Sequence, residues 1–328
     1  MSRFRKSRKQ IKYSLLVVTI KLLLVAVRVL PRILTMKLFS SLGALAFILL
    51  KEERTKAVNN LRIAYGPEKS EAEIQAMAKE VFVNLAKSGA EFAIKMNRKK
   101  PEQFFKDLEV RGEEHLRKAA AKGKGILALV SHMGSWECTA LVLPMLGIST
   151  YAIGKKLGNE KLNNLLFESR GKMGVQTLAR GSSYKAMLRV LKENNLLGIL
   201  IDQDTDVRGV FVDFYDKPAY TPIGGAMLAM DSGAPVLPIF YLKKEDDTYE
   251  FIVEEEIPLV KTGNRRRDME ENTRIFHGVI EKYIKKYPTQ WVWMHNRWKT
   301  TPEMVEAKKQ MREKKKNATA QAGFSATA

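Results

Sequence analysis

The 328-residue sequence is poor in cysteine and histidine, and this scarcity excludes several kinds of chemistry. Its single cysteine, Cys138, rules out an intrachain disulfide and a cysteine-rich zinc site. No His-x-x-x-His pair and no aspartate-rich loop is present, so we predict no metal and no bound cofactor. A Walker loop, a Gly-x-Gly-x-x-Gly fingerprint and a Gly-x-Ser-x-Gly elbow are also missing, which leaves no protein serine as an obvious nucleophile.

Acidic residues are few as well, with 36 Asp and Glu against 56 Lys and Arg and a formal net charge of +20. Such a surface favours an acidic partner, which could be nucleic acid, anionic lipid, a phosphorylated substrate or an acidic carrier protein. The cations are spread along the chain, and no nucleic-acid-binding module is recognisable. We therefore expect no nucleic acid partner, and a non-enzymatic basic membrane protein that binds nucleic acid is the less favoured alternative.

A long apolar run without charges is missing too. Residues 1–12 carry six cations and no acid, and the apolar stretch Tyr13–Leu50 is interrupted by four more cations. A spanning helix needs about 20 mostly apolar residues, and Tyr13–Leu30 approaches this only with Lys21 near its middle. An interfacial helical hairpin with Pro31 at its bend fits equally well. We expect a membrane anchor over residues 1–50, with its basic flank on the cytoplasmic side; a buried helical pair is the alternative.

The remaining chain divides into an α/β domain over residues 51–304 and a basic tail over 305–328, which we predict to be a fraying helix followed by disorder. Ser70 and Glu73 form a capping box that should open a helix through about Met96. Short apolar runs then alternate with amphipathic stretches, which predicts a mixed central sheet flanked by helices. The expected strands are 125–131, 149–154, 174–179, 196–202, 235–242 and 248–260; we expect a loop at 209–222 and a last helix at 268–286.

Three of the predicted strands end on polar residues, at His132, at Arg180 and at Asp202-Gln203-Asp204. In open α/β sheets, ligands bind beyond the carboxyl ends of the strands. These strand ends are therefore where we expect the chemistry.

His132 and Glu137 form a His-x4-Glu pair around a Gly-Ser turn. Five residues apart inside one helix, the two side chains would lie about 140° apart, so they can meet only if the helix begins between them. A carboxylate bound to one ring nitrogen fixes the tautomer and leaves the other nitrogen as a base. We expect this arrangement, with the nucleophile supplied by a substrate hydroxyl. The alternative is that His132 is a capped structural histidine.

Several spaced motifs carry a family resemblance over about residues 10–300. They are the apolar N-terminus with its proline bend, ERTKAVNNLRIAYGP (53–67), HMGSWE (132–137), SRGKMG (169–174), ILIDQD (199–204), the segment 211–240 and YPTQWVWMHNRWK (287–299). In this order they resemble the late lipid A acyltransferase family, the lauroyl and myristoyl transferases, and the related mycobacterial phosphatidylinositol mannoside acyltransferases.

The resemblance implies a glycerolphosphate-acyltransferase-like fold and transfer of a fatty acyl chain from a thioester to a hydroxyl of a membrane glycolipid, such as a lipid A precursor. The thioester donor would be an acyl carrier protein or coenzyme A. The implied partners are acyl carrier protein, anionic membrane lipid and a phosphorylated glycolipid acceptor, and the implied location is the bacterial inner membrane, with the catalytic domain on the cytoplasmic side. A lysophospholipid or glycerol-phosphate acceptor is the alternative within the same enzyme class.

The resemblance also gives roles to residues. His132 would deprotonate the acceptor, Glu137 would orient His132, and Arg170 would stabilise an oxyanion or hold a phosphate; the alternative for Arg170 is a surface pairing with Glu168. Asp202 is a second candidate partner of His132 or a strand-end cap. Gln203, Arg180, Trp136 and Arg297 are expected to contact substrate, although the aromatic cluster around Arg297 could equally be packing; His115 and His277 are expected on the surface.

Overall fold

A seven-stranded mixed sheet forms the centre of the molecule. The structure is a computed structural model and describes residues 17–98, 100–154, 160–179, 183–311 and 313. The strands lie in the order β1 (Leu108–Arg111), β9 (Tyr249–Val253), β8 (Val236–Lys243), β2 (Ile126–Val130), β5 (Leu196–Leu200), β3 (Thr150–Gly154) and β4 (Val175–Ala179). Strand β9 runs antiparallel to β8 and the other neighbouring pairs are parallel, which confirms the predicted mixed sheet.

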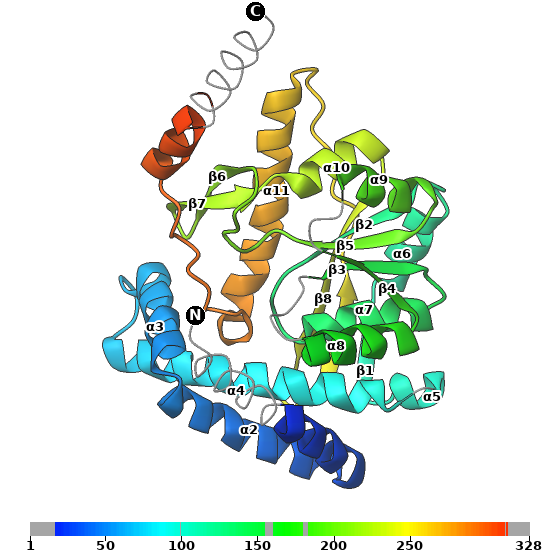
Figure 1. The fold of residues 1–328 in the computed structure, drawn as a ribbon, viewed down its shortest axis with the longest axis vertical. Helices are drawn as coiled ribbons and strands as arrows, with labels where there is room; N and C mark the ends of the chain where they lie inside the picture. Colours follow the sequence, from blue (N-terminus) through cyan, green and yellow to red (C-terminus); the bar gives the residue numbers. More distant parts are fainter. Residues whose placement is uncertain (1–16, 99, 155–159, 180–182, 312, 314–328) are drawn as a thin grey trace, which may run out of the picture.

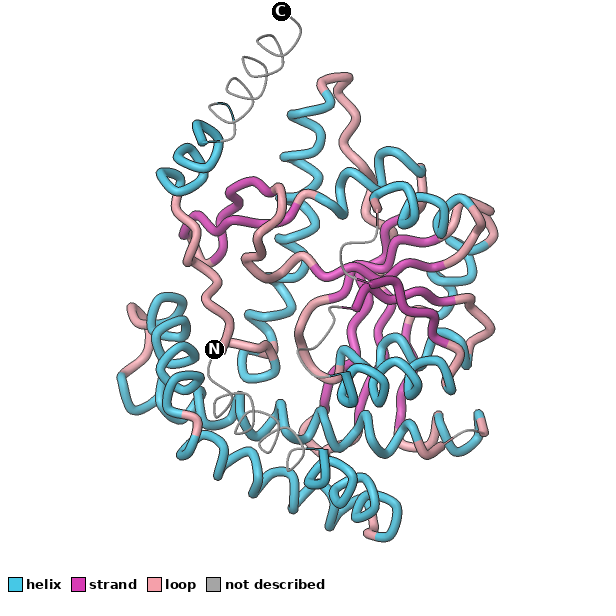
Figure 2. The backbone as a smooth tube through the Cα atoms, viewed as in Figure 1, coloured by secondary structure: helices cyan, strands magenta, loops and turns pink. Residues whose placement is uncertain are grey.

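Helices cover both faces of this sheet (Figures 1 and 2). One apolar cluster contains Ala128 and Val130 of β2 together with residues of the helices on one face, and the other contains Leu127 and Leu129 with the helices on the opposite face. The first face carries α6 (Glu113–Ala120), α7 (Trp136–Met145) and α8 (Glu160–Lys172); the second carries α9 (Tyr184–Lys192), α10 (Gly224–Ser232) and α11 (Arg265–Lys286). The long helix α4 (Glu71–Met96) contributes residues to both clusters. Because both faces are covered, the inner strands are continuous apolar runs rather than alternating ones.

Local sequence signals set the helix boundaries where they were strong. The predicted capping box is present, because the Ser70 side chain accepts from the Glu73 backbone N–H and the Glu73 carboxylate accepts from the Ser70 N–H. Helix α11 begins at Arg265, slightly before the predicted start at 268, because the Asn264 side chain caps it by accepting from the Arg267 N–H. Two short helices, α5 (Pro101–Phe104) and η1 (Pro288–Gln290), follow α4 and α11 respectively.

A β-hairpin occupies the stretch that we expected to be a loop. Its strands are β6 (Gly209–Phe214) and β7 (Lys217–Pro222). The two turn residues between them, Tyr215 and Asp216, have φ angles of 51° and 57°. A two-residue hairpin turn with both φ angles positive usually contains Asn-Gly or Asp-Gly, so the sequence Tyr-Asp gave no signal. Strand β1, at the edge of the sheet, was not predicted either.

The N-terminal helices pack along the side of the domain. Residues 17–29 are helical, Pro31 precedes α2 (Arg32–Leu49), and α3 (Lys51–Tyr65) follows, so the bend predicted at Pro31 is present. Helix α2 lies so close to α4 that a Cβ atom at Gly43 would come within 2.7 Å of the Val83 Cα. At the other end of the chain, residues 302–311 are helical and exposed, and most of the predicted tail lies outside the described residues.

Among the described residues, α2 is the one helix long and apolar enough to cross a membrane, and little of it is buried. The segment for which spanning was considered, Tyr13–Leu30, begins outside the described residues. The exposed apolar side chains of these helices are Val18, Leu22, Val25, Val29, Ile33, Leu34, Leu45, Ile48 and Leu49. They leave a large apolar surface at this end of the molecule, of the kind that marks an interaction site.

Candidate active site

His132 stands on a tight loop between β2 and α7, as the sequence predicted. Gly134 has a φ of 55°, and a Cβ atom there would lie 2.1 Å from the Tyr241 carbonyl oxygen, so a residue with a side chain would be strained at this position. Ser135 immediately precedes α7, which puts Trp136 and Glu137 in the first turn of that helix. The helix therefore does begin between His132 and Glu137.

Asp202, just beyond β5, holds the imidazole. Its Oδ1 lies 2.9 Å from Nδ1 of His132, and its Oδ2 accepts from the His132 backbone N–H at 2.7 Å. Burial by itself would raise the pKa of Asp202, but His132 and the Trp291 indole N–H outweigh burial and lower the pKa to about 2. The ionised carboxylate can only accept, so Nδ1 carries the ring proton and Nε2 is left as the basic nitrogen.

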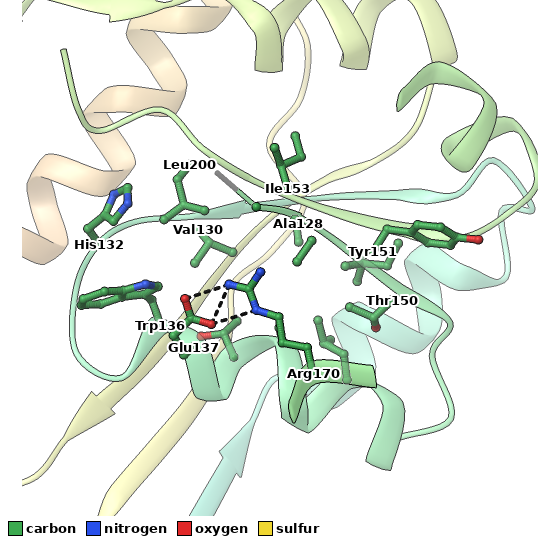
Figure 3. A pocket seen from close by; sticks show the side chains of 17 residues that line it. Ala128, Val130, His132, Trp136, Glu137, Thr150, Tyr151, Ile153, Arg170 and Leu200 are labelled. Carbon is green, nitrogen blue, oxygen red and sulfur yellow. Dashed lines mark hydrogen bonds and ion pairs between the residues drawn. The ribbon is translucent and has the colours of Figure 1, made fainter. Parts of the chain in front are cut away.

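Glu137 does not hold His132, and this expectation is wrong. The Glu137 carboxylate accepts from Arg170 instead, with Arg170 Nη2 at 2.7 and 2.8 Å from its two oxygens and Nε at 3.1 Å (Figure 3). The physical reason is competition: the guanidinium offers a planar fork of donors to a carboxylate, whereas the imidazole is already bound by the fully buried Asp202.

Arg170, on α8, is buried rather than paired on the surface with Glu168. Its Nε and Nη2 are used by Glu137, whereas Nη1 is buried and has no hydrogen-bond partner among the described residues. The end of β3 leaves room for this group, since a Cβ atom on Gly154 would lie only 3.2 Å from Nη1. A buried donor without a partner is costly in a native protein and calls for a physical explanation.

An apolar cavity of about 320 Å³ extends from these groups beneath the sheet. His132, Trp136, Glu137 and Arg170 line one part of it (Figure 3). Its walls are made by β2, β3, β5 and α7, through Ala128, Val130, Thr139, Ala140, Leu143, Thr150, Tyr151, Ala152, Ile153, Gly154, Leu196, Gly198 and Leu200. Ala128, Gly198 and Ala152 are paired across three adjacent strands, and their small side chains leave the space open.

The other residues predicted to bind substrate lie in different places in the structure. Trp136 lines the cavity, with its ring centroid 5.6 Å from that of His132. Gln203 is half-buried directly after Asp202, and Arg180 lies outside the described residues.

Arg297 is completely buried, so the expectation that it contacts substrate is wrong. Its guanidinium donates to the Tyr220 carbonyl, to Thr221 Oγ1 and to Nε2 of His277. His277 is buried too, not on the surface as expected, and burial together with Arg297 lowers its pKa to about 3. These two residues form part of the aromatic packing around Phe214.

Trp291 is a site residue that sequence reasoning missed. Its indole Nε1 donates to Asp202 Oδ2 at 2.8 Å. The only signal in the sequence was its place in the dense aromatic cluster of the last motif, for which packing and headgroup binding were the alternatives. Among the described residues, no group of three or more His, Cys, Asp or Glu side chains could hold a metal ion.

Comparison with known proteins identifies the relatives of this chain. A family model described as bacterial lipid A biosynthesis acyltransferase matches residues 1–300. A lipid A biosynthesis acyltransferase of Haemophilus influenzae is 28% identical over 79% of this chain and 79% of its own length. A lipid A biosynthesis lauroyltransferase of Escherichia coli is 29% identical over 85% of this chain and 90% of its own. A phosphatidylinositol mannoside acyltransferase of Mycobacterium tuberculosis is 28% identical over 40% of this chain and 43% of its own.

Proposed function

We propose a reaction for this chain from the family to which it belongs, the bacterial lipid A biosynthesis acyltransferases, which makes it an acyltransferase. In this proposal it moves a fatty acyl chain from a thioester to a hydroxyl of a membrane glycolipid, namely a lipid A precursor. The acyl donor is a thioester of acyl carrier protein or of coenzyme A. The same proposal gives the α/β domain a glycerolphosphate-acyltransferase-like fold. The observation that carries it is a histidine, bound by a buried carboxylate, beside an apolar cavity.

His132 acts as the general base in this proposal. Its Nδ1 is occupied by Asp202, so Nε2 accepts the proton of the acceptor hydroxyl as the oxygen attacks the thioester carbonyl. A C–O bond forms, the C–S bond breaks, and the departing thiolate takes the proton from the imidazole. Asp202 fixes the ring and stabilises its positive charge while the proton is held there.

Arg170 stabilises the oxyanion that develops on the carbonyl. Arg170 lines the cavity, and its buried Nη1 has no hydrogen-bond partner among the described residues. Glu137 fixes the guanidinium plane through two nitrogens, and a donor held in place before the reaction has no reorganisation to undergo as charge develops. This role gives the unpartnered buried donor a physical reason, and it makes Glu137 a positioning residue for Arg170.

The acyl chain of the donor occupies the apolar cavity. Leu200, Gly198 and Leu196 line it along β5, a length of roughly 13 Å at about 3.3 Å per residue. The carbonyl end would lie beside His132 and Arg170, and the hydrocarbon would extend toward Leu196 and Thr150. An alkyl chain leaving water for such a pocket gains about 0.8 kcal/mol per buried CH₂.

Attachment to the bacterial inner membrane, with the catalytic domain on the cytoplasmic side, is part of the proposal. The exposed side chains Val18, Leu22, Val25 and Val29 recur at helical spacing along residues 17–29, and Lys21 and Arg28 flank them. One face of helix α2 packs against α4, so this face cannot contact lipid. These two features favour an anchor lying in the membrane interface over a spanning helix.

Two measurements test the proposal. Lipids from a deletion strain are analysed by mass spectrometry for a glycolipid lacking one acyl chain, and the purified enzyme is assayed with acyl carrier protein and coenzyme A thioesters. The variant His132→Ala should lose about 10²–10⁴ in rate. His115→Ala is the matched control, because His115 lies on α6 and its Nδ1 contacts the Val253 carbonyl oxygen. Near-normal turnover by folded His132→Ala, or an unchanged lipid profile in the deletion strain, would contradict it.

A further inference from the structure

The segment 288–293, which follows α11 and which we call the strap, is joined to the catalytic loop by backbone hydrogen bonds. The Gly134 N–H donates to the Gln290 carbonyl at 2.8 Å, and the Val292 N–H donates to the His132 carbonyl at 3.0 Å. Met133 and Trp291 thereby form an isolated antiparallel bridge. The strap therefore fixes the backbone directly after the base, on both sides of Met133.

The strap is itself tied to two other parts of the molecule. The Gln290 side-chain amide makes a pair of bonds to the main chain of Lys243 at the end of β8, accepting from its N–H at 2.9 Å and donating to its carbonyl at 2.7 Å. On the other side, the Asn60 amide on α3 donates to the carbonyls of Trp293 and His295. These contacts give a physical role to two motifs, 53–67 and 287–299, that had none in the catalytic proposal.

The Trp291 side chain extends from the strap to the catalytic carboxylate. Its Nε1 donates to the same Asp202 oxygen, Oδ2, that accepts from the His132 backbone N–H. With Oδ2 engaged by two donors, the carboxylate cannot rotate freely, and Oδ1 is left facing Nδ1 of His132. The indole is itself fixed, because it is 1% exposed and its ring lies 4.8 Å from that of Trp293 and 5.4 Å from that of Phe214.

We propose that Trp291 is a positioning residue of the acyl transfer reaction, and that its indole N–H orients the Asp202 carboxylate that holds the base. This inference rests on the proposed function, because it requires His132 to be the general base. Of the strap residues, it gives a role in the reaction to Trp291, whose side chain reaches Asp202. The indole makes no contact with substrate; it acts through Asp202 and His132.

The test compares Trp291→Phe with Trp293→Phe. Both tryptophans are buried, but Trp293 Nε1 donates to the Pro288 carbonyl within the strap and not to Asp202. Trp291→Phe should lower kcat about 10- to 100-fold, the loss typical of a small misplacement of a catalytic group, and leave the KM of the acyl donor unchanged. Trp293→Phe should lower the thermal midpoint by about as much as Trp291→Phe does, but keep kcat within about twofold of the parent.

The pH dependence separates positioning from packing. The indole N–H directs the positive end of its dipole at the carboxylate, so removing it strengthens the negative field at the imidazole and favours the protonated ring. The acid limb of the kcat/KM profile should therefore move to higher pH in Trp291→Phe, stay in place in Trp293→Phe, and move to lower pH in Asp202→Asn, which removes the negative charge. A Trp291→Phe enzyme with the parent's kcat and acid limb would overturn the inference.

A measurement on the folded protein covers the case in which Trp291→Phe does not fold. The chain has four tryptophans, and their indole ¹H–¹⁵N signals are assigned from phenylalanine replacements of the other three. The Trp291 signal should shift in Asp202→Asn and the Trp293 signal should not; equal shifts or none would overturn the inference. Activity retained in His132→Ala would instead refute the proposed function, so the two failures are distinguishable.

Discussion

Gly198 offers the most direct test that the cavity holds the acyl chain. It lies on β5 between Ala128 of β2 and Ala152 of β3, and it lines the cavity. A Cβ atom at this position would meet only the Tyr151 carbonyl oxygen, at 3.7 Å, which is ordinary contact. A larger side chain can therefore enter the cavity from the sheet without forcing the strands apart.

Replacing Gly198 with alanine and then leucine should shorten the acyl chain that the enzyme accepts. Each methylene of the substrate that no longer fits is worth about 1–3 kcal/mol in kcat/KM, or roughly 10- to 200-fold. Gly198→Leu should thus reduce kcat/KM for the longest donor the parent uses by at least about tenfold. The value for donors several carbons shorter should stay within about twofold, and Gly198→Ala should fall between.

The assay is competition among acyl thioesters of different length, with the products separated by mass spectrometry. Gly278→Leu is the control, since a Cβ atom there, on an exposed part of α11, meets nothing within 4 Å. A shift in the thermal midpoint of Gly198→Leu without a change in chain-length preference would show that the side chain fills a space the substrate does not use. That result would refute the assignment of the cavity to the acyl chain.

Three further predictions follow from the site and the anchor. Because the pKa of Asp202 is lowered from 3.8 to about 2, its ionised form should contribute about 2 kcal/mol of stability above pH ~4, and this contribution should be lost as the pH falls toward 2; acid titration of the free energy of unfolding should show a smaller loss in Asp202→Asn. Arg170→Lys should lower kcat about 10²–10³-fold, since an ammonium cannot hold Glu137 with a planar fork and also present a free donor to the oxyanion; full activity with lysine would show that charge alone suffices. Leu22→Asp combined with Val25→Asp should weaken flotation with phosphatidylglycerol vesicles, whereas Met304→Asp, on the exposed C-terminal helix, should not; equal flotation of all three proteins would exclude residues 17–29 as a lipid-binding surface.

Local pattern in the sequence was enough for the helices and strands with strong signals. The apolar run before His132 became β2, the Ser70 box opened α4, and Pro31 separated two N-terminal helices. These features depend on neighbours within a few residues, where periodicity and capping act directly. The β6–β7 hairpin was missed for the same reason, because its turn residues, Tyr215 and Asp216, carry none of the usual turn chemistry.

The sequence alone predicted an α/β domain with buried strands. It also placed a histidine at the end of one strand and carboxylates at the end of another. Only the tertiary structure decided which carboxylate holds the histidine. Asp202 is 70 residues from His132 along the chain, yet β2 and β5 are parallel neighbours in register, so their carboxyl ends lie side by side. Glu137, only five residues from His132, instead forms an ion pair with Arg170 on another helix. Spacing along the chain limits what can meet, but the pairing of strands and the competition among buried charges determine what does.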